Sequence, residues 1–316
     1  MLKQITQEDF NRIESLFNDL IEKRKSTEYA LSETVKDDVR KWISNGDAVI
    51  LALFERTRPL GFVMSYPESY MIGIIHVDDT NGDSSMVRKR LFDEAFTDLS
   101  KENAIIRTGG PSIDPDLSEH ILKKGFRRYD RATMRIARKD IDSLSQPSLP
   151  DEFDFGTYGA EMRRMVAKLI HKANANHIES ESYPEYFGSD DGAMRLIEEI
   201  EKHEHHPFSK VLLRGEEVIG VCFIILNTDE AGHIAEICVD NDYRKIGLGR
   251  NLLVYSLKET ARSLACLNRI TLDVTLKNTA RRLYQSLGFE DMNEFTVYTW
   301  ISELDSARPA RSGMET

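Results

Sequence analysis

The sequence predicts an α/β fold in two tandem domains of one architecture. The first observation is an apolar strand, His233 to Val239, that turns through a glycine-rich loop into a helix starting near Arg250. The second observation is an internal repeat of short motifs. The matched positions lie 159, 162 and 163 residues apart, pairing Gly61 with Gly220, Val77 with Val239, and Gly125 with Gly288. A repeat of this size indicates two like domains and not a solenoid of short units.

The first half of the sequence resembles a degenerate copy of the second half. It has an apolar strand at Val49 to Phe54, but the loop after Val77 carries one glycine and the acidic residues Asp78, Asp79 and Asp83. We therefore expect residues 1–141 to form a degenerate domain. The following stretch, 142–151, is rich in Ser and Pro and shows no hydrophobic period, as is typical of a linker.

The second domain is expected over residues 152–302, and the polar residues 303–316 are expected to form a disordered tail. Asp154 to Tyr158 can form a first strand, and Ala160 to Ala173 has the three-and-four apolar spacing of a helix with one buried face. Lys210 to Leu226 reads as a β-hairpin. The remaining elements are the strand at His233 to Val239, a helix at about Arg250 to Leu264 and a strand at Arg269 to Val274.

The loop before the helix has the spacing Arg244-x-x-Gly247-x-Gly249. A helix N-terminus offers free backbone N–H groups and the positive end of the helix dipole to an anion. Glycines let the backbone close around phosphate oxygens, and Arg244 and Arg250 can add charge. The spacing suits a diphosphate, and the alternative is an ordinary helix start with two turn glycines.

This loop and the sequence after it resemble the GNAT superfamily of acyl-CoA-dependent N-acyltransferases, over about residues 153–300. The family's Leu-Tyr-x-x-x-Gly-Phe pattern falls on Leu283, Tyr284, Gly288 and Phe289. The resemblance implies two tandem GNAT-like domains, each with a mixed, mostly antiparallel sheet flanked by helices. It also implies an N-acetyltransferase activity in the second domain.

The resemblance implies acetyl-CoA as the cosubstrate. The residues expected to bind it are Ile237, Cys238, Val239, Arg244, Lys245, Ile246, Gly247, Leu248, Gly249, Arg250 and Asn278. The strand segment would contribute main-chain groups to the pantetheine arm and the thioester carbonyl. Asn278 departs from the family pattern, because the family often has its Asn seven residues before the Tyr, where Lys277 stands here.

Acetyl transfer to an amine needs a neutral amine and a proton for the departing thiolate. Glu236 lies in an otherwise apolar strand, where burial raises the pKa of a carboxyl group toward the range of a general base. Its alternative role is an ion pair with a nearby Arg or Lys. The resemblance places Tyr284 beside the CoA sulfur as general acid, and the alternative is packing against Phe289. No Ser-His or Cys-His nucleophile is apparent, so we expect direct transfer.

The resemblance implies that the segment from His171 to Phe208 forms a wall of the acceptor site. Its candidate residues are His171, His177, Glu179, Glu181, Tyr183, Tyr186, Asp190 and Asp191. Acidic and aromatic side chains can recognise an ammonium group by charge and by ring faces. The alternative is a solvated loop. The cluster His203 to His206 lacks helical spacing and a nearby cysteine, so no metal site is predicted.

The composition limits the function classes. A formal net charge of −11 argues against a nucleic-acid partner. The three cysteines, Cys222, Cys238 and Cys266, are too few for a disulfide scaffold and read as buried thiols. The N-terminus has no apolar signal segment and the apolar runs are strand-sized, so we expect a cytoplasmic protein with no membrane partner. The expected substrate is a small-molecule or peptide amine, and the chain is a monomer or a homodimer.

Two rival functions belong to other classes. A non-catalytic acyl-CoA-binding sensor would keep the phosphate loop and tolerate loss of the Glu236 and Tyr284 functions. A Rossmann dinucleotide protein would need Gly-x-Gly-x-x-Gly within a repeated βαβ pattern, and the sequence has neither.

Overall fold

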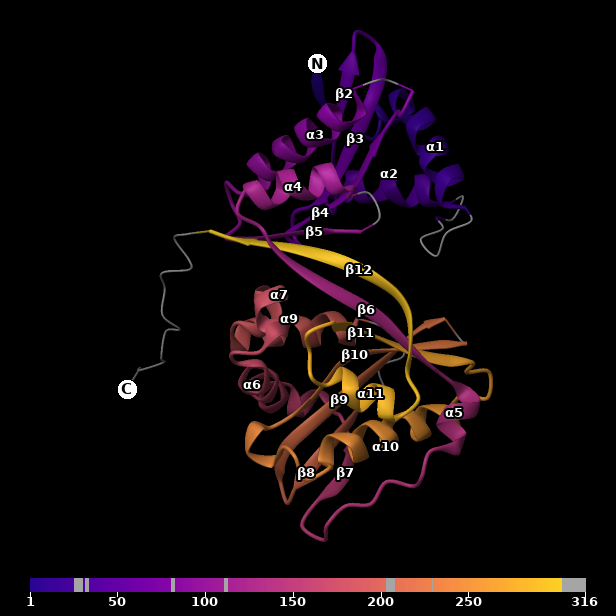
Figure 1. Cartoon of the computed structure of the whole chain (residues 1–316), viewed down its shortest axis with the longest axis vertical. Coiled ribbons are helices and arrows are strands. Elements are labelled where there is room, and N and C mark those ends of the chain that lie inside the picture. The colour runs from indigo at the N-terminus through magenta and orange to yellow at the C-terminus, as the bar shows by residue number, and fades with distance from the viewer. Residues whose placement is uncertain are drawn as a thin grey trace. The chain divides into compact units, whose positions relative to one another are not determined.

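The computed structural model describes residues 1–25, 31, 34–80, 83–110, 113–202, 208–228 and 230–302 (Figure 1). The predicted tail, 303–316, and the cluster His203 to His206 lie outside these residues. The chain divides into two compact units. The first comprises Met1–Tyr129 together with the chain from Thr296, and the second comprises Asp130–Phe295.

The first unit is a mixed sheet with helices on both faces. Its strands, in order across the sheet, are β1 (Leu2–Ile5), β2 (Val49–Glu55), β3 (Arg58–Tyr66), β4 (Met71–Val77), β5 (Ile105–Gly109) and, from Thr296, β12 (Glu290–Ile301). The pair β4–β5 is parallel and the other described pairs are antiparallel. Its helices are η1 (Phe10–Arg12), α1 (Glu14–Arg24), α2 (Val35–Asn45), α3 (Ser84–Leu99) and α4 (Pro115–Lys123).

Alternation along the strands builds a core on each face of this sheet. Ile50 and Ala52 of β2 pack with residues of α1 and α2. Leu51 and Leu53 of the same strand pack with residues of α3 and α4, on the opposite face (Figure 1). Successive side chains of a strand point to opposite faces, so an apolar run such as Val49–Phe54 can support helices on both sides.

The second unit repeats this architecture. Its strands, in order across the sheet, are β6 (Arg127–Ala137) from Asp130, β11 (Arg269–Thr275), β10 (Ala231–Val239), β9 (Glu217–Thr228), β8 (Lys210–Arg214) and β7 (Asp154–Thr157). The pair β10–β11 is parallel and the other described pairs are antiparallel. Its helices are α5 (Arg138–Ser143), η2 (Ala160–Met162), α6 (Arg163–Asn174), α7 (Ile178–Ser182), α8 (Pro184–Phe187), α9 (Asp190–Glu201), η4 (Asn241–Tyr243), α10 (Leu248–Ser263) and α11 (Arg281–Ser286).

The helices of the second unit also divide between the two faces. Val221 and Phe223 of β9 pack with α6 and α9. Cys222 and Ile224 pack with α10 on the other face. The predicted fold class, two tandem domains with mostly antiparallel sheets flanked by helices, is confirmed, and the predicted strands and helices of the second half are found with shifts of a few residues at their ends.

Each unit is completed by a strand from the other half of the repeat. Strand β6 follows the Gly125-Phe126 motif of the first half but pairs with β11, matching Arg131 to Thr275. Strand β12 follows the equivalent Gly288 motif but pairs with β5, matching Val297 to Gly109. The predicted boundaries, 1–141, 142–151 and 152–302, describe the sequence repeat and remain predictions. In the structure, β6 of the first half completes the sheet of the second unit, and β12 of the second half completes the sheet of the first.

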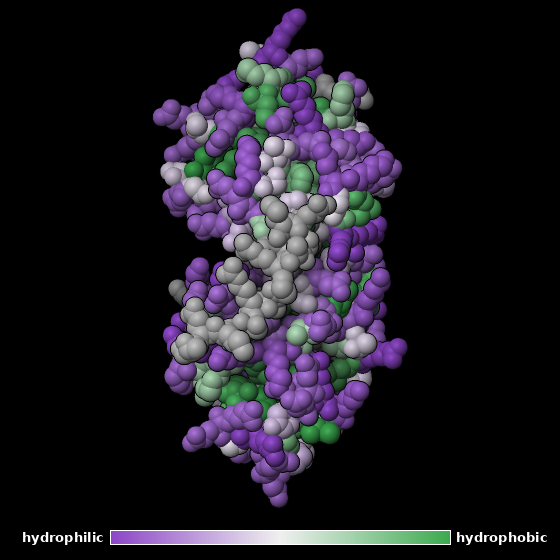
Figure 2. Space-filling model, turned by 90° about the vertical axis from the view of Figure 1, so that its left-hand side faces the viewer, coloured by the Kyte–Doolittle hydropathy of each residue, from purple (hydrophilic) through white to green (hydrophobic). Residues whose placement is uncertain are grey.

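The exposed large hydrophobic residues are scattered along the chain: Met1, Met86, Leu122, Met165, Ile246 and Met292. On the face shown in Figure 2, hydrophilic residues predominate and hydrophobic residues occur in small groups among them. No helix in the described part of the chain combines the length and the apolar character that spanning a bilayer requires.

Candidate active site

The second unit contains a cavity at the point where β10 and β11 separate. The two strands pair only from Ala231 with Arg269 to Ile234 with Leu272. A register shift between Ile234 and Glu236 interrupts the pairing of β10 with β9 at the same place. Beyond it, the rest of β10 has no strand partner on its β11 side among the described residues, and its residues line a cavity of about 590 Å³. Unpaired main-chain groups are thus available inside the cavity.

The first turn of α10 forms one wall of this cavity. The residue that caps the helix, Gly247, has a φ of 88°, a left-handed conformation that favours glycine. The N–H groups of a first helical turn have no partner within the helix, and the helix dipole makes this end positive. Among the described residues, a Cβ atom at Gly249 would meet only Val239 Cγ2 within 4 Å, at 3.6 Å. The fold itself therefore leaves room for a side chain there, on the wall of the cavity.

The basic residues of this loop have different partners. Arg244 donates from Nε to the carbonyl oxygen of Val239 (3.0 Å) and from a terminal nitrogen to that of Ala173 (2.7 Å). It therefore fixes the loop to the end of β10 and to α6. Arg250 donates to Ser286 Oγ (2.8 Å). Lys245 lines the cavity and has no carboxylate partner among the described residues.

Most of the predicted cofactor-binding residues meet at the cavity. The lining includes Ile237, Cys238, Val239, Arg244, Lys245, Gly247, Leu248, Gly249, Arg250 and Asn278. Ile246 is 60% exposed and does not belong to the lining. A loop side chain that points to solvent cannot be distinguished by spacing alone from its inward-facing neighbours.

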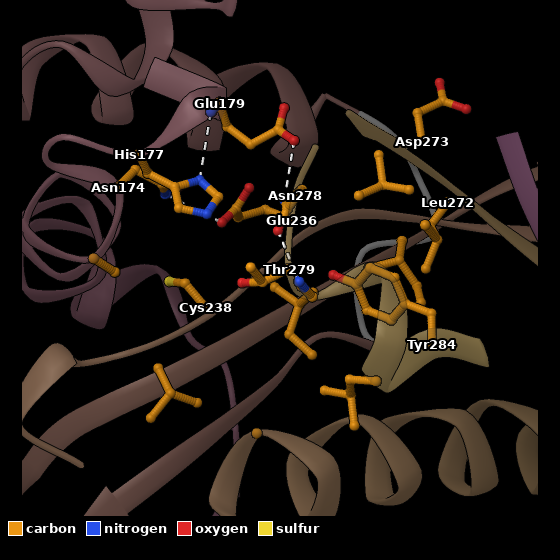
Figure 3. A pocket seen from close by; sticks show the side chains of 18 of the residues that line it. Asn174, His177, Glu179, Glu236, Cys238, Leu272, Asp273, Asn278, Thr279 and Tyr284 are labelled. Carbon is orange, nitrogen blue, oxygen red and sulfur yellow. Dashed lines mark hydrogen bonds between the residues drawn. The ribbon is translucent and has the colours of Figure 1, made fainter. Parts of the chain in front are cut away.

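Glu236 lies on β10 and faces the cavity (Figure 3). Burial raises the pKa of its carboxyl group to about 7. Asn174 Nδ2, at the end of α6, donates a long hydrogen bond of 3.5 Å to its Oε1 atom. No Lys or Arg among the described residues forms an ion pair with Glu236, so the ion-pair alternative is not what the structure shows.

Tyr284 lies on α11 and is 7% exposed. Its hydroxyl group points into the cavity (Figure 3) and has no hydrogen-bond partner in the described part of the chain. Burial, followed by the nearby charge of Glu236, raises the pKa of the phenol, so the hydroxyl group keeps its proton at neutral pH. The ring also packs against Phe289, with centroids 5.9 Å apart. The two interpretations made from the sequence are therefore compatible.

The predicted acceptor segment splits into residues inside and outside the cavity. His177, Glu179, Tyr183 and Tyr186 line it, and Phe187 and Leu196 add apolar surface. The other predicted residues, His171, Glu181, Asp190 and Asp191, do not line it, and His171 Nδ1 instead lies 2.7 Å from an Asp190 carboxylate oxygen.

His177 caps α7 and lines the cavity. Its Nδ1 atom accepts a hydrogen bond from the backbone N–H of Glu179 (3.4 Å). Burial lowers the pKa of the imidazole, and the charge of Glu179 only partly opposes this shift. The ring is therefore neutral near pH 7, with its proton on Nε2.

A buried ion pair joins Glu179 to Arg131 of β6. A terminal nitrogen of Arg131 donates to Glu179 Oε2 at 2.5 Å, and the two side chains are only 7% and 13% exposed. The other carboxylate oxygen accepts from the backbone N–H of Thr275 and from Asn278 Nδ2, both at 3.1 Å. Burial alone would raise the pKa of Glu179, but the charge of Arg131 and these hydrogen bonds together lower it.

Asn278 has both ends of its amide engaged. Nδ2 donates to Glu179, and Oδ1 accepts from the backbone N–H of Ala280 (2.9 Å). The side chain thus shapes the turn between β11 and α11, while the residue lines the cavity as expected.

Sequence reasoning missed several residues of the cavity: Arg131, Asn174, His233, Asp273 and Thr279. The signal for Arg131 is a charge within a strand whose other face, Ala132, Met134 and Ile136, is fully apolar and buried. The partners of Arg131 are distant in sequence, so no local pattern shows that it enters a site with Glu179.

Comparisons with known proteins bear on the family and on the fold of the chain. Residues 172–289 match the model of the acetyltransferase (GNAT) family. No match is found among curated proteins. The structure is similar to that of a GCN5-related N-acetyltransferase from Sphaerobacter thermophilus, with 14% identity and a TM-score of 0.64 over 95% of both chains. It is also similar to a tandem GNAT protein from the clavulanic acid biosynthesis pathway, with 12% identity and a TM-score of 0.57 over 95% of this chain and 98% of that one. At such identities these likenesses establish the fold alone.

Proposed function

Residues 172–289 match the acetyltransferase (GNAT) family, and from this premise we propose that the second unit transfers an acetyl group from acetyl-CoA directly to an amine. The acceptor is a small molecule or a peptide. The observation that carries the proposal is that Glu236 and Tyr284 line one cavity together with the open first turn of α10. An acid, a base and an anion site are the parts that acetyl transfer to an amine requires.

The cavity wall suits the diphosphate of acetyl-CoA. The N–H groups of the first turn of α10 face it, Gly247 has the conformation that a tight loop needs, and Lys245 and Arg250 supply positive charge. The backbone of Ile237 and Cys238, which pairs with β9 but lies beyond the pairing of β10 with β11, would hold the pantetheine arm. When bound, acetyl-CoA supplies the acyl group as a thioester.

Glu236 would accept the proton of the acceptor ammonium group, directly or through a water molecule. A base is most useful when its pKa lies near the working pH, and the pKa of Glu236 is about 7. The hydrogen bond from Asn174 stabilises the carboxylate form and fixes its direction. Both effects support the role of a base at neutral pH.

Tyr284 would give its proton to the departing thiolate. Burial keeps the phenol protonated, and the unpaired hydroxyl group lies on the cavity side of α11. The proton on this hydroxyl group is thus available where a leaving group can take it.

The test is a turnover assay that follows free thiol release from acetyl-CoA with a panel of amines: polyamines, amino-acid derivatives, aminoglycosides and peptides with free N-termini. We expect release that depends on both the amine and the protein. Binding of CoA without turnover on any amine would favour the acyl-CoA sensor, and binding of NADH in its place would revive the dinucleotide protein.

A further inference from the structure

The ion pair between Arg131 and Glu179 is not used by the chemistry proposed above, although both residues line the cavity. Taking two charges out of water costs free energy that their attraction often fails to recover. The pair is also imperfectly satisfied, because Arg131 Nε is buried and has no acceptor among the described residues. Such a pair contributes little to stability, so its presence in the cavity needs another reason.

The pair joins three segments that form the site. Arg131 belongs to β6, which is a strand of the first half of the sequence repeat. Glu179 belongs to α7, on the acceptor side of the cavity. Its Oε1 atom binds the end of β11 at Thr275 and the turn at Asn278 that leads into α11 and Tyr284. The Glu179 carboxylate thus fixes α7, on the acceptor side of the cavity, relative to the end of β11 and to α11, which carries Tyr284.

Arg131 is itself fixed by several contacts. It donates to Thr275 Oγ1 (3.0 Å) and to the carbonyl oxygen of Asp273 (3.3 Å), both on β11. Its guanidinium group also lies 4.7 Å from the ring centroid of Tyr183, on the acceptor wall. The guanidinium group therefore cannot move without disturbing both β11 and its contact with the ring of Tyr183.

We propose that Arg131 and Glu179 are positioning residues of the acetyl-transfer site, so that a strand of the degenerate half completes the site of the other half. This inference rests on the proposed function. Neither residue donates or accepts the transferred proton. They hold Glu236 and Tyr284 in their relative positions and set the electrostatic environment in which Glu236 works.

The charges of Glu179 and Arg131 change the pKa of Glu236 in defined directions. The charge of Glu179 raises the pKa of Glu236, and the charge of Arg131 lowers it. The other polar or titratable groups near Glu236 come from four further elements and from β10 itself: Asn174 on α6, His177 before α7, Cys222 on β9, Cys238 on β10 and Tyr284 on α11. Removing Glu179 should lower the titration midpoint of Glu236, and then removing Arg131 should raise it again.

The experiment titrates the Glu236 carboxyl carbon by NMR in full-length protein labelled with ¹³C at glutamate carboxyl groups, assigned with Glu236→Gln. We expect the midpoint to fall in Glu179→Gln and to recover partly in the double variant Glu179→Gln/Arg131→Met. Gln keeps one acceptor oxygen for Thr275 and Asn278 and removes the charge. Glu201→Gln is the matched control, because Glu201 pairs with Arg163 outside the cavity lining, and it should leave the midpoint unchanged.

A kinetic measurement separates position from charge. At pH 9 the wild-type Glu236 is ionised, so a lower pKa cannot change the fraction of Glu236 in the active form there. The double variant, which leaves no unpaired charge and remains measurable if the single variant does not fold, should still lose about 10- to 100-fold in kcat at pH 9, the scale expected for a small misplacement of reacting groups. Glu201→Gln should keep the wild-type kcat.

An unchanged midpoint in the folded variants, together with an unchanged kcat at pH 9 in the double variant, would overturn the inference and leave a purely structural ion pair. The NMR arm does not need turnover. If no amine is acetylated by the wild-type protein while the midpoints move as expected, the proposed function fails and the link between the ion pair and Glu236 stands.

Discussion

Burial raises the pKa of both Glu236 and Tyr284, and the two shifts suit different roles. It raises the pKa of the carboxyl group into the neutral range, where the group can both accept and release a proton. It raises the pKa of the phenol further from neutrality, so that Tyr284 carries its proton at neutral pH and can offer it to the departing thiolate. One desolvated cavity therefore supplies both a base and an acid.

Replacing Tyr284 with Phe removes the acidic hydroxyl group and keeps the ring that packs on Phe289. We expect kcat to fall by about 10² to 10⁴, the usual scale of general acid catalysis, with little change in CoA affinity. Steady-state kinetics and calorimetric titration with CoA measure the two quantities. Tyr255→Phe is a suitable control, because Tyr255 stacks on Phe155 outside the cavity lining. A wild-type kcat in Tyr284→Phe would assign the acid role to another group.

The pH dependence follows from the pKa of Glu236, about 7. The carboxylate is the active form of a base, so kcat/KM of the wild-type protein should decline as the pH falls through about 7. In Glu236→Gln this acidic limb should disappear and the remaining rate should be low. A pH–rate profile whose acidic limb is the same in both proteins would assign the limb to another carboxylate, to water or to the substrate.

The same pKa shift has a consequence for stability. The folded-state pKa of Glu236 lies above its ordinary value of 4.5, so the folded protein binds this proton more tightly than the unfolded chain does. The stability due to that proton is present below pH 4.5 and is lost as the pH rises through about 7. Glu236→Gln should therefore gain stability relative to the wild type between pH 5 and pH 8, by at most about 3 kcal/mol. Denaturant unfolding at both pH values measures this difference, and a constant difference would contradict the shift.

Single residues were predictable from the sequence where a local rule marked them. Glu236 is a charge in an apolar strand, and Tyr284 belongs to a motif. Arg131 and Asn174 have no such mark, because what makes them part of the site is contact with residues far along the chain: Arg131 is 48 positions from Glu179, and Asn174 is 62 positions from Glu236.

Among the elements, α10 and its loop carry the cofactor assignment. Gly247 needs its glycine for backbone conformation, with a φ of 88°. Gly249 has an ordinary helical place, and the space around a Cβ atom there is limited by Val239 alone among the described residues. A substitution at Gly247 therefore tests the backbone conformation of the loop, whereas a substitution at Gly249 tests the space in the cavity.

Replacing Gly249 with Val should leave the protein folded and fill space at the anion site. We expect CoA affinity to fall by at least about tenfold, because the branched side chain would stand where phosphate oxygens approach the first turn of α10. Calorimetric titration measures the affinity, and thermal unfolding verifies the fold. Gly249→Ala, with a smaller side chain, should have a smaller effect. Wild-type affinity in a folded Gly249→Val protein would remove the phosphate-loop assignment.

The order and type of the elements could be predicted from the sequence because periodicity and turn residues are local signals. The predicted helix at Ala160–Ala173 is a short 3₁₀ turn followed by α6. The separation of β10 from β11 could not be predicted, since it depends on the register shift between Ile234 and Glu236 and on pairing with strands elsewhere.

For the whole molecule, the sequence repeat showed two like units but not the exchange of β6 and β12. Both strands follow a Gly-Phe motif and alternate in hydrophobicity, so either could complete either sheet. Which sheet a strand joins depends on cross-strand side-chain pairs, such as Thr133 with Asp273 in the second unit. Neither half of the repeat contains its complete unit.

The first unit has its own carboxylates where the second has the glycine-rich loop. Asp79 binds Lys23 and Arg88, and Asp78 binds Arg58. Hydrogen bonds from the Thr80 side chain, then from Arg58, lower the pKa of Asp78 to about 2. Asp83 stands at the N-cap position of α3 and makes no side-chain hydrogen bond to the helix. The side chains of Asp78 and Asp79 are held in ion pairs, and the sequence after Val77 lacks the paired glycines of the second unit, so we propose that the first unit binds no acyl-CoA.

We propose that one chain holds one acyl-CoA site, at the start of α10. The decisive measurement is calorimetric titration of the full chain with acetyl-CoA, with a Gly247→Ala/Gly249→Val variant measured beside the wild type. We expect a stoichiometry near one for the wild type and no detectable binding for the folded variant. Two sites per chain, or one site that survives in the variant, would contradict it.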